Sequence, residues 1–273
     1  MPKEWRLIDS GPGEAFDNMA LDEALFLSYA QSGLPTLRIY RWSRASLSFG
    51  FSQSPEAVLD PEQCRRQGIP FVRRITGGGV LLHSVELTYS LTCSRQDLQR
   101  PSGVKDGFKL LCSFLLVFYR HLGLRPFFSI DFREPGLRKP SSFCPAARED
   151  YDILIDNKKI GGNAQRRRKD CILQQGSIPV YFDLEQVRPL VKGDLSAAAG
   201  TSTCLKELLG SEPDPASLSA LLRLSFEESF ACTLREARPT GYESGLAASL
   251  ARGKYASKEW NINRSYAKTV LVG

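Results

Sequence analysis

One cysteine lies in surroundings unlike those of a core thiol. Cys144 occurs in the stretch SSFCPAARED, among serine, proline, alanine and charged residues, whereas a structural cysteine usually lies on an apolar strand or helix. A thiolate nucleophile needs an accessible position and a nearby positive charge that lowers its pKa. The surrounding stretch supplies that charge at Arg133, Arg138, Lys139 and Arg148. The residues alone leave both a nucleophile and an incidental free thiol open.

A lysine lies beside a pair of glycines in the stretch NKKIGGNAQRRR, whose pattern is that of a strand. Lys159 precedes Gly161 and Gly162 there. Because glycine weakens a strand, two together indicate that another group approaches the backbone closely. A lysine beside such a gap could orient a carbonyl group or act as an acid or base. The residues equally allow a surface lysine on an edge strand.

Three successive glycines, residues 77–79, directly follow a strand-like stretch in RRITGGGVLLH. Backbone N–H groups of successive glycines can approach an anion or a carbonyl closely. The spacing matches neither a P-loop nor a dinucleotide-binding turn. Arg73, Arg74 and His83 surround the glycines and favour a site. A tight turn without a ligand is the alternative.

The chain has two histidines, which limits the partners available to the cysteine. His121 falls near the end of a predicted long helix, where a histidine interacts favourably with the last turn. A Cys–His pair would therefore need His83. The other possibility is a pair between Cys144 and Lys159.

The hydrophobic pattern predicts the elements that would position these residues. Helices are predicted at 16–33, 61–68, 104–123, 183–191, 203–210, 214–231 and 242–257. Strands are predicted at 36–42, 46–53, 70–75, 126–132, 151–156, 158–165 and 171–182, with a hairpin-like pair at 80–94. The segment 133–148 has no period and is long for a structureless loop, which indicates a functional loop.

The order of these elements predicts the domain organisation. Strands dominate before residue 185 and helices after it, with no linker between them. We therefore expect a single α+β catalytic domain over residues 1–273, in which residues 185–273 form a mostly helical C-terminal part.

The amino-acid composition limits the class of protein to which the chain can belong. The 273 residues are 42% hydrophobic and 24% charged, which is ordinary for a soluble globular protein. The longest apolar run, residues 110–119, is well short of the ~20 residues that a membrane span needs. The N-terminal stretch lacks a signal-peptide pattern. We therefore expect a cytoplasmic protein that does not bind a membrane.

The cysteine pattern and the net charge limit which metals and which partner molecules we expect. Seven dispersed cysteines form no C-x-x-C pair, which argues against zinc and against a redox dithiol, so we expect no metal site. The net charge of +6 comes with clusters of Arg and Lys. Without interleaved aromatic residues, this charge favours an acidic protein partner over a nucleic acid. A solvated surface is the alternative.

Four motifs in order resemble the superfamily of lipoate-protein ligases, biotin-protein ligases and octanoyltransferases. FVRRITGGGVLLHSVELTYSL is similar to its first signature, and YDILIDNKKIGGNAQRRRKDCILQQGSIP is similar to its second. The opening WRLIDSG…FDNMALDEAL and the late KYASKEWN also match, so the resemblance covers nearly the whole chain. It implies an α+β fold of the class II aminoacyl-tRNA synthetase/biotin synthetase type, with mixed β-sheets flanked by helices.

Within the superfamily the chain resembles octanoyltransferases of the LipM type, which carry a nucleophilic cysteine before the second signature. Cys144 lies at that place, seven residues before Tyr151, and the resemblance implies that it accepts the acyl group. Lys159 stands at the family's conserved lysine and is implied to be catalytic with it. The positions implied to bind substrate are Arg73, Arg74, Thr76, Gly77, Gly78, Gly79, His83, Gly161, Gly162, Asn163, Ala164, Gln165 and Gly176.

Three positions depart from the family's pattern. Gln175 stands where a histidine is usual, Asn163 replaces a serine, and Ser84 replaces an aspartate. Each departure changes a hydrogen-bonding group near the implied site. They bear on the choice of substrate more than on the scaffold.

The implied function is octanoyl transfer in protein lipoylation. The donor would be octanoyl-acyl carrier protein, and the acceptor a lysine of a lipoyl domain, in glycine-cleavage H protein or a 2-oxoacid dehydrogenase E2 subunit. Exchange between thioesters needs no ATP, so we expect no cofactor, and we expect a monomer. Because the sequence ends at Gly273, soon after EWNINR, we expect the added C-terminal domain of many ligases to be absent.

Other members of the superfamily fit the same motifs. An ATP-dependent lipoate-protein ligase would use residues 77–79 and Lys159 and leave Cys144 idle. An amidotransferase would take the acyl group from another lipoyl domain. A non-enzymatic carrier-binding relative is a further alternative, which the departures at Gln175 and Ser84 keep open.

Overall fold

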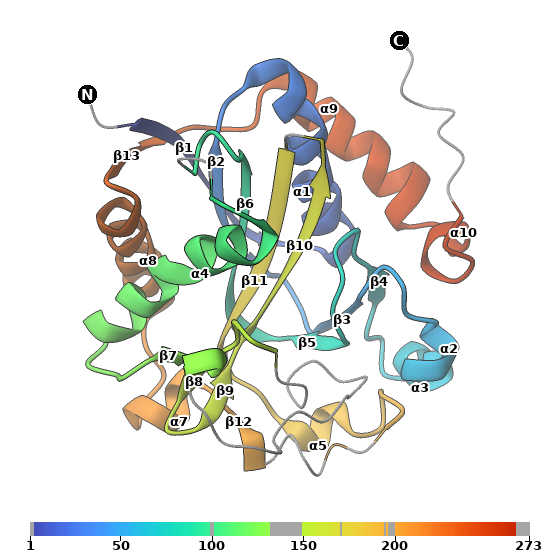
Figure 1. Cartoon of the computed structure of the whole chain (residues 1–273). Helices are drawn as coiled ribbons and strands as arrows, with labels where there is room; N and C mark the ends of the chain where they lie inside the picture. Colours follow the sequence, from blue (N-terminus) through green and yellow to red (C-terminus); the bar gives the residue numbers. More distant parts are fainter. Residues whose placement is uncertain are drawn as a thin grey trace.

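A six-stranded mixed sheet forms the centre of the molecule, with the order β10-β11-β6-β2-β1-β13 (Figure 1). The computed structural model describes residues 3–98, 101–131, 149–169, 171–193, 195 and 200–265. β1 pairs in parallel with β2 and β13, whereas the other neighbours are antiparallel. The strands are β1 (Lys3–Gly13), β2 (Thr36–Trp42), β6 (Val85–Ser94), β10 (Gly162–Arg168), β11 (Cys171–Tyr181) and β13 (Cys232–Glu236).

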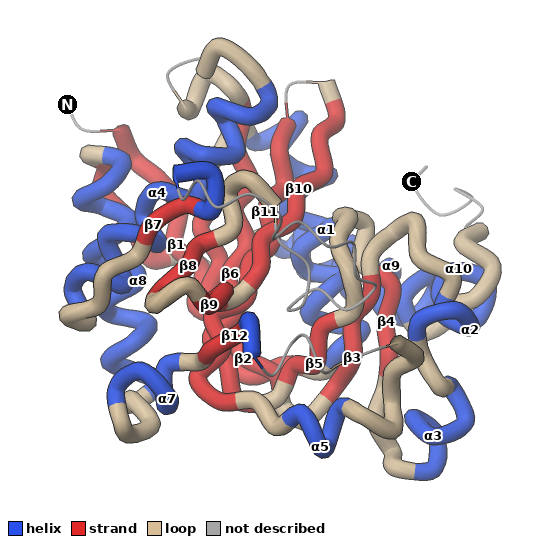
Figure 2. The backbone as a smooth tube through the Cα atoms, turned by 60° about the horizontal axis from the view of Figure 1, so that its bottom comes forward, coloured by secondary structure: helices blue, strands red, loops and turns tan. Residues whose placement is uncertain are grey.

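Two smaller sheets lie to either side of the lower half of β11 in Figure 1, and Figure 2 shows them from below. One has the order β4-β3-β5 and the other the order β12-β9-β8-β7. The first contains β3 (Ser46–Phe49), β4 (Phe71–Arg73) and β5 (Leu81–His83). The second contains β7 (Phe127–Phe128), β8 (Ile153–Ile155), β9 (Lys158–Ile160) and β12 (Ser202–Thr203).

Helices cover both faces of the central sheet because its strands carry buried side chains on both sides. Along β2, Leu37 and Ile39 join the core under α4 (Val104–His121) and α8 (Pro215–Phe230). Tyr40 and Trp42 join the core under α1 (Ala15–Ser32) and α9 (Gly241–Leu250). The remaining helical segments are α2 (Pro55–Val58), α3 (Pro61–Arg66), the 3-10 turn Ser129–Asp131, α5 (Leu184–Val187), α7 (Leu205–Leu209), the π-helical turn Ala251–Tyr255 and α10 (Lys258–Asn261).

Local capping groups explain where the long helices begin and end. Gly33 adopts a left-handed conformation after α1, and its N–H donates to the Tyr29 carbonyl at 2.8 Å. Asp214 precedes α8 and accepts from the Ser217 N–H at 2.8 Å. These ends agree with the helices predicted at 16–33 and 214–231.

Several strand predictions need correction. The stretch 158–165 is not one strand, because β9 ends at Ile160 and β10 begins at Gly162 in another sheet. The stretch 80–94 is not a hairpin, since β5 and β6 also belong to different sheets. The strand predicted at 126–132 is reduced to β7, and β13, which was not predicted, lies in the part predicted to be mostly helical. Asp156 and Asn157 form the turn between β8 and β9, with φ values of 49° and 62°.

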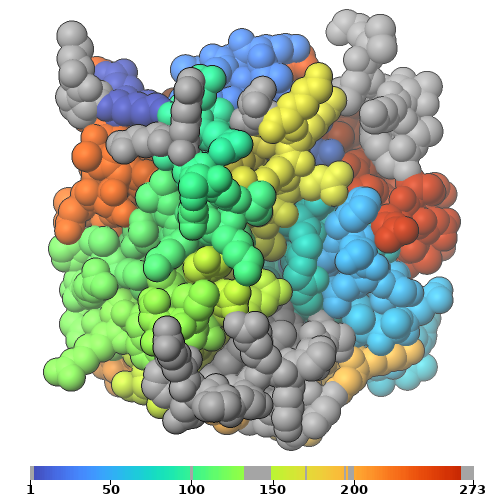
Figure 3. Space-filling view, viewed as in Figure 1, coloured from blue at the N-terminus to red at the C-terminus, as the bar shows by residue number. Residues whose placement is uncertain are grey.

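Segments far apart in the sequence share one face of the molecule. In Figure 3, α4 in green, β10 in yellow and the α2–α3 region in blue lie next to one another. Among the described residues, none of the helices has both the length and the apolar composition needed to cross a membrane.

Candidate active site

Two glycines let the chain approach β11 closely. Gly161 has a φ of 72°, and a Cβ there would overlap the carbonyl oxygen of Ser177. A Cβ on Gly176 would overlap the Tyr89 ring and the Asn163 amide. The absence of these two side chains therefore brings the end of β9 against β11 and Asn163 next to Tyr89.

Hydrogen bonds orient the Asn163 amide. Tyr89 Oη donates to Asn163 Oδ1 at 2.6 Å, and Gln174 Nε2 donates to Tyr89 Oη at 2.9 Å. Gln174 Nε2 also donates to the Leu111 carbonyl of α4 at 3.1 Å. The hydrogen bond from Tyr89 identifies the Asn163 oxygen, so the other amide atom is Nδ2, which carries two N–H donors. Asn163 can thus offer N–H groups to a ligand.

Arg74 holds the glycine triplet in place. Its Nη2 donates to the carbonyls of Gly77 at 3.0 Å and Gly79 at 2.8 Å. Gly78 has a φ of 90°, and its carbonyl oxygen lies so close to Gly50 that a Cβ on Gly50 would overlap it. A trans peptide points its N–H opposite to its C=O. The Gly77 carbonyl therefore turns the Gly78 N–H away from the guanidinium group.

A buried hydrogen-bonded chain runs from this arginine to a carboxylate. Arg74 Nη1 donates to Ser48 Oγ at 2.6 Å, and Ser48 Oγ lies 2.5 Å from His83 Nε2. His83 Nδ1 lies 2.7 Å from Glu86 Oε1, and the imidazole stacks on Trp42 with 3.8 Å between ring centres. Both ring nitrogens of His83 are therefore engaged, which disfavours His83 as the base for a cysteine.

Glu86 remains ionised within this chain. Burial of the Glu86 carboxyl raises its pKa, but the attraction of His83 and hydrogen bonds from His83, Thr88 and Ser177 outweigh burial and hold the pKa below its ordinary value. Ser177 Oγ donates to Glu86 Oε2 at 2.9 Å. This hydrogen bond joins Glu86 on β6 to Ser177 on β11.

Lys159 forms a buried ion pair. Its Nζ lies 2.8 Å from Asp152 Oδ2, and Lys159 and Asp152 are 3% and 7% exposed. Asp152 Oδ2 also accepts from the Glu149 N–H at 2.7 Å. Asp152 therefore joins the lysine to the chain that leaves the segment containing Cys144.

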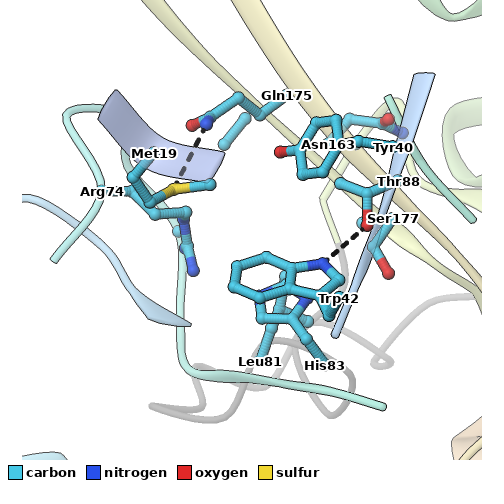
Figure 4. A pocket seen from close by; sticks show the side chains of 14 residues that line it. Met19, Tyr40, Trp42, Arg74, Leu81, His83, Thr88, Asn163, Gln175 and Ser177 are labelled. Carbon is cyan, nitrogen blue, oxygen red and sulfur yellow. Dashed lines mark hydrogen bonds between the residues drawn. The ribbon is translucent and has the colours of Figure 1, made fainter. Parts of the chain in front are cut away.

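Two neighbouring pockets meet at this place. Pocket A lies between α1, the glycine triplet and strands β10 and β11, and has an empty volume of about 420 Å³, part of it open to solvent (Figure 4). Pocket B contains Lys159 and Gly161 in its wall and shares Leu81 and Ser177 with pocket A. Pocket A is lined by Met19, Tyr40, Trp42, Arg74, Gly78, Leu81, His83, Thr88, Gly162, Asn163, Ala164, Gln175, Gly176 and Ser177.

The lipoyl protein ligase A/B catalytic domain family matches residues 14–227. This chain belongs to that family. Octanoyltransferases LipM of Geobacillus kaustophilus and Bacillus subtilis are each 34% identical over 97% of this chain and 100% of their own length. These matches confirm the superfamily that the motifs predict.

Solved structures of lipoate-protein ligases share the fold. A lipoate-protein ligase A bound with ATP is 26% identical, with a TM-score of 0.79 over 95% of this chain and 98% of that chain. A putative lipoate protein ligase from T. acidophilum with bound lipoic acid is also 26% identical, with a TM-score of 0.78 over 95% and 99%. The predicted α+β fold with mixed sheets flanked by helices is confirmed.

The structure brings many of the predicted site residues of this lipoyl ligase-type domain together. Lys159 and Gly161 lie at pocket B. Cys144 lies outside the described residues, as do its charged neighbours at 133–148. The predicted substrate-binding residues that line pocket A are Arg74, Gly78, His83, Gly162, Asn163, Ala164 and Gly176.

Arg73 is not among the residues that line pockets A and B. Its guanidinium donates to the carbonyls of Phe51, Gln53, Trp260 and Asn261. Burial, and then the charge of a neighbouring arginine, lower its pKa to about 10. Arg73 supports the loop behind the pocket instead of touching its interior.

Other predicted positions also act behind the lining. Thr76 donates to Gln175 Oε1 at 2.7 Å, and Gln165 Nε2 donates to Gln174 Oε1 at 2.6 Å. Gly77 and Gly79 present their carbonyls to Arg74. Their contacts position the groups that line pocket A.

Sequence reasoning missed several residues of the site. Met19, Trp42 and Ser177 line pocket A, and Glu86 lines pocket B. A usable signal was present in β6, where Glu86, Thr88 and three further polar residues alternate with apolar ones and are all buried. Buried polar side chains at every second position of a strand indicate a polar cavity wall.

Within the described part of the chain, no group of three or more His, Cys, Asp or Glu is placed to hold a metal ion.

Proposed function

We infer that this chain is an octanoyltransferase of protein lipoylation that carries the octanoyl group as a thioester on Cys144. The activity rests on similarity over nearly the whole chain to octanoyltransferases LipM. The observation in the structure that supports it best is that pocket A meets pocket B at Leu81 and Ser177, because the buried Lys159 lies in the wall of pocket B.

Burial of the other cysteines supports Cys144 as the nucleophile. Burial raises the pKa of Cys64 and of Cys232 to about 11. A thiol with so high a pKa is almost wholly protonated at neutral pH and reacts slowly. Cys144 is the remaining one of seven cysteines. The six buried ones are Cys64, Cys93, Cys112, Cys171, Cys204 and Cys232.

The first half-reaction exchanges one thioester for another. The Cys144 thiolate attacks the carbonyl carbon of octanoyl-acyl carrier protein, and a new C–S bond forms. The bond to the carrier's sulfur breaks, and that sulfur takes up the proton that Cys144 gave up. Because the two thioesters are close in free energy, the step needs no ATP.

The second half-reaction forms an amide. The ε-amine of an acceptor lysine attacks the acyl-Cys144 carbonyl, a C–N bond forms, and the C–S bond breaks. The amine proton passes to the Cys144 sulfur, which restores the enzyme. An amide is more stable than a thioester, so transfer runs downhill. The acceptors in this proposal are lipoyl domains, in glycine-cleavage H protein or a 2-oxoacid dehydrogenase E2 subunit.

Lys159 is suited to stabilise the charge that develops during both steps. In its pair with Asp152 it is an ammonium group in a buried place, where a hydrogen bond to an oxyanion is strong. The Asn163 Nδ2 group is a second candidate donor at pocket A. The loss of one such donor in other acyl-transfer enzymes costs about 3–4 kcal/mol.

Intact-protein mass spectrometry tests the nucleophile. Incubation of the wild-type chain with octanoyl-acyl carrier protein should add the mass of one octanoyl group, and Cys144→Ala should abolish the adduct. Cys232→Ala is a matched control at a buried thiol of raised pKa and should keep it. An adduct on Cys144→Ala, together with undiminished transfer, would exclude Cys144.

A lipoate-protein ligase is the second candidate, because a solved relative of 26% identity is a lipoate-protein ligase A bound with ATP. The octanoyltransferase and ligase activities can be distinguished by the substrates that they use. A ligase would lipoylate an acceptor domain from free lipoate and ATP with release of pyrophosphate, and Cys144→Ala would leave that reaction intact. The octanoyltransferase needs the carrier thioester and releases no pyrophosphate. Octanoylated H protein as donor would reveal transfer between lipoyl domains.

A further inference from the structure

We propose that Met19 and Gln175 form the closed end of pocket A, and that the side chain at position 19 sets the longest acyl chain the enzyme accepts. The inference rests on the proposed function, because it takes pocket A to hold the acyl chain. It adds the residues that determine which chain length fits.

The strand β11 runs along pocket A, from the end near Lys159 to the opposite end. Lys159 and Gly161 line pocket B, which meets pocket A at Ser177. Gly161 packs directly on the Ser177 carbonyl. Gln175 is two residues further along β11, about 7 Å away at the usual rise of a strand. A carbonyl group near Lys159 would therefore have its alkyl chain directed from Ser177 toward Gln175.

The side chains at the two ends of this path, Ser177 and Gln175, lie on one face of β11. Ser177 and Gln175 point to the same side of β11, because side chains two residues apart share a face. Both line pocket A. In Figure 4, Met19 and Gln175 lie together on the side of the pocket opposite Leu81 and His83.

Gln175 is a fixed part of the end wall. Its Oε1 accepts from Thr76 at 2.7 Å, and its Nε2 donates to Asp22 Oδ2 at 2.7 Å. Asp22 is held in turn by Arg38 Nη1 at 2.6 Å. The amide therefore has no freedom to turn aside for a longer chain.

Met19 is the adjustable part of the wall. Its Sδ lies 3.5 Å from Gln175 Nε2, and the side chains of Met19 and Gln175 are both buried. A thioether side chain is unbranched, flexible and apolar, so it adapts to the terminal methyl group of an alkyl chain. The size of the side chain at position 19 therefore determines how much space remains beyond that methyl group.

Acyl-chain competition tests the wall. Wild type, Met19→Ala and Met19→Phe are each offered equimolar hexanoyl-, octanoyl- and decanoyl-acyl carrier protein, and the acyl-enzymes are resolved by mass. One buried methylene group changes binding about fourfold. The decanoyl:octanoyl ratio should rise at least about tenfold in Met19→Ala. The hexanoyl:octanoyl ratio should rise similarly in Met19→Phe.

The readout is a ratio within one sample, so partial unfolding of a variant does not affect it. Leu25→Ala removes a side chain of similar size from a buried position of α1 that does not line pocket A, and should keep the wild-type ratios. Wild-type ratios in both Met19 variants, with octanoyl transfer intact in wild type, would overturn this inference alone. Failure of wild type to form any acyl-enzyme would instead overturn the proposed function on which it rests.

Discussion

The ion pair of Lys159 and Asp152 determines the charge that the site presents to an acyl group. Two oppositely charged groups 2.8 Å apart and shielded from water compensate each other. Removal of the Asp152 carboxylate withdraws a negative charge 2.8 Å from the buried ammonium group, which is costly. Asp152 is therefore a positioning residue for Lys159, and it also binds the Glu149 backbone after the segment that contains Cys144.

We expect Asp152→Asn to lower the rate of acyl-enzyme formation about 100-fold at neutral pH, in the range typical of lost acid–base groups. A neutral amide cannot hold the Lys159 ammonium group by an ion pair, so that group is less well fixed where the acyl carbonyl would bind. Asp152→Glu keeps the negative charge and should retain more of the rate than Asp152→Asn. Single-turnover acylation followed by mass measures the rates.

The neighbouring lysine provides the control for this prediction. Lys158 pairs with Glu207 at 2.5 Å, but this pair is largely exposed to solvent. Glu207→Gln should leave the rate unchanged, since exposed pairs contribute little. Equal rates in Asp152→Asn and wild type would contradict the assigned role.

The sequence carries enough information to anticipate this pair but not the Glu86 chain. The Asp156-Asn157 turn predicts a hairpin, and in its register Leu154 pairs with Lys159. Asp152 then lies diagonally opposite Lys159 on the same face, within reach of a long side chain. Glu86 instead binds Ser177 from a distant strand, and no local pattern specifies which of many strands will be its neighbour.

At the scale of elements, the pairing of β10 with β11 depends on positions that lack side chains. Gly176 leaves the space occupied by the Tyr89 ring and the Asn163 amide, which hydrogen-bond to each other. Neither group can move without breaking the chain of bonds through Gln174. A glycine is therefore required where two strands and a side-chain network meet.

Gly176→Ala should lower the free energy of unfolding by about 1–3 kcal/mol, as is usual when a methyl group is forced into a filled core. It should also reduce octanoyl transfer, because Asn163 lines pocket A. Urea unfolding and acylation rates measure the two effects. Gly245→Ala on α9 has open space around the added methyl group and should be neutral or slightly stabilising. Equal effects of the two substitutions would refute the requirement.

The glycine pair also shows how far the pattern of residues predicts elements. Close approach of another group was predicted at Gly161 and Gly162, and the Ser177 carbonyl lies against Gly161. The break between β9 and β10 was not predicted, because a left-handed glycine can interrupt a strand or end it. β13 was missed since five residues have little periodicity, and its parallel pairing with β1 joins segments far apart in the chain.

For the whole molecule, an ion pair ties the two ends of the described chain together. Arg6 on β1 donates to Glu243 on α9 through two hydrogen bonds of 2.9 and 2.6 Å. Ser28 on α1 donates to the same carboxylate at 3.0 Å. Burial raises the pKa of Glu243, but hydrogen bonds from Arg6 and from the Thr240 N–H, with the attraction of Arg6, bring it below its ordinary value of 4.5.

This depressed pKa makes the contribution of Glu243 to stability dependent on pH. The stabilisation is present above about pH 4.5, the ordinary value, and is lost as pH falls through the lower pKa of the folded state. At pH 7, Glu243→Gln should unfold with a free energy about 3 kcal/mol lower than wild type, because Arg6 loses its partner. The difference should shrink below pH 4. Urea unfolding of both proteins at pH 7, 5, 4 and 3 measures it.

The exposed pair of Glu4 and Arg235 serves as the control. Glu4→Gln should match wild type at every pH, because a solvent-exposed pair is screened and contributes little. A difference between Glu243→Gln and wild type that stays constant from pH 7 to pH 3 would contradict the role of the ionised carboxylate.

The carbonyl acceptors of Arg73 have a consequence for when the site can be assembled. They come from Phe51 and Gln53 before the glycine triplet and from Trp260 and Asn261 in α10. Before α10 and Ile262 have been synthesised, this buried cation has two of its five carbonyl acceptors. The pocket wall would then acquire its final order only late in translation, after most of the central sheet has left the ribosome. Premature stops before α10 should release chains that contain every proposed catalytic group and are still inactive.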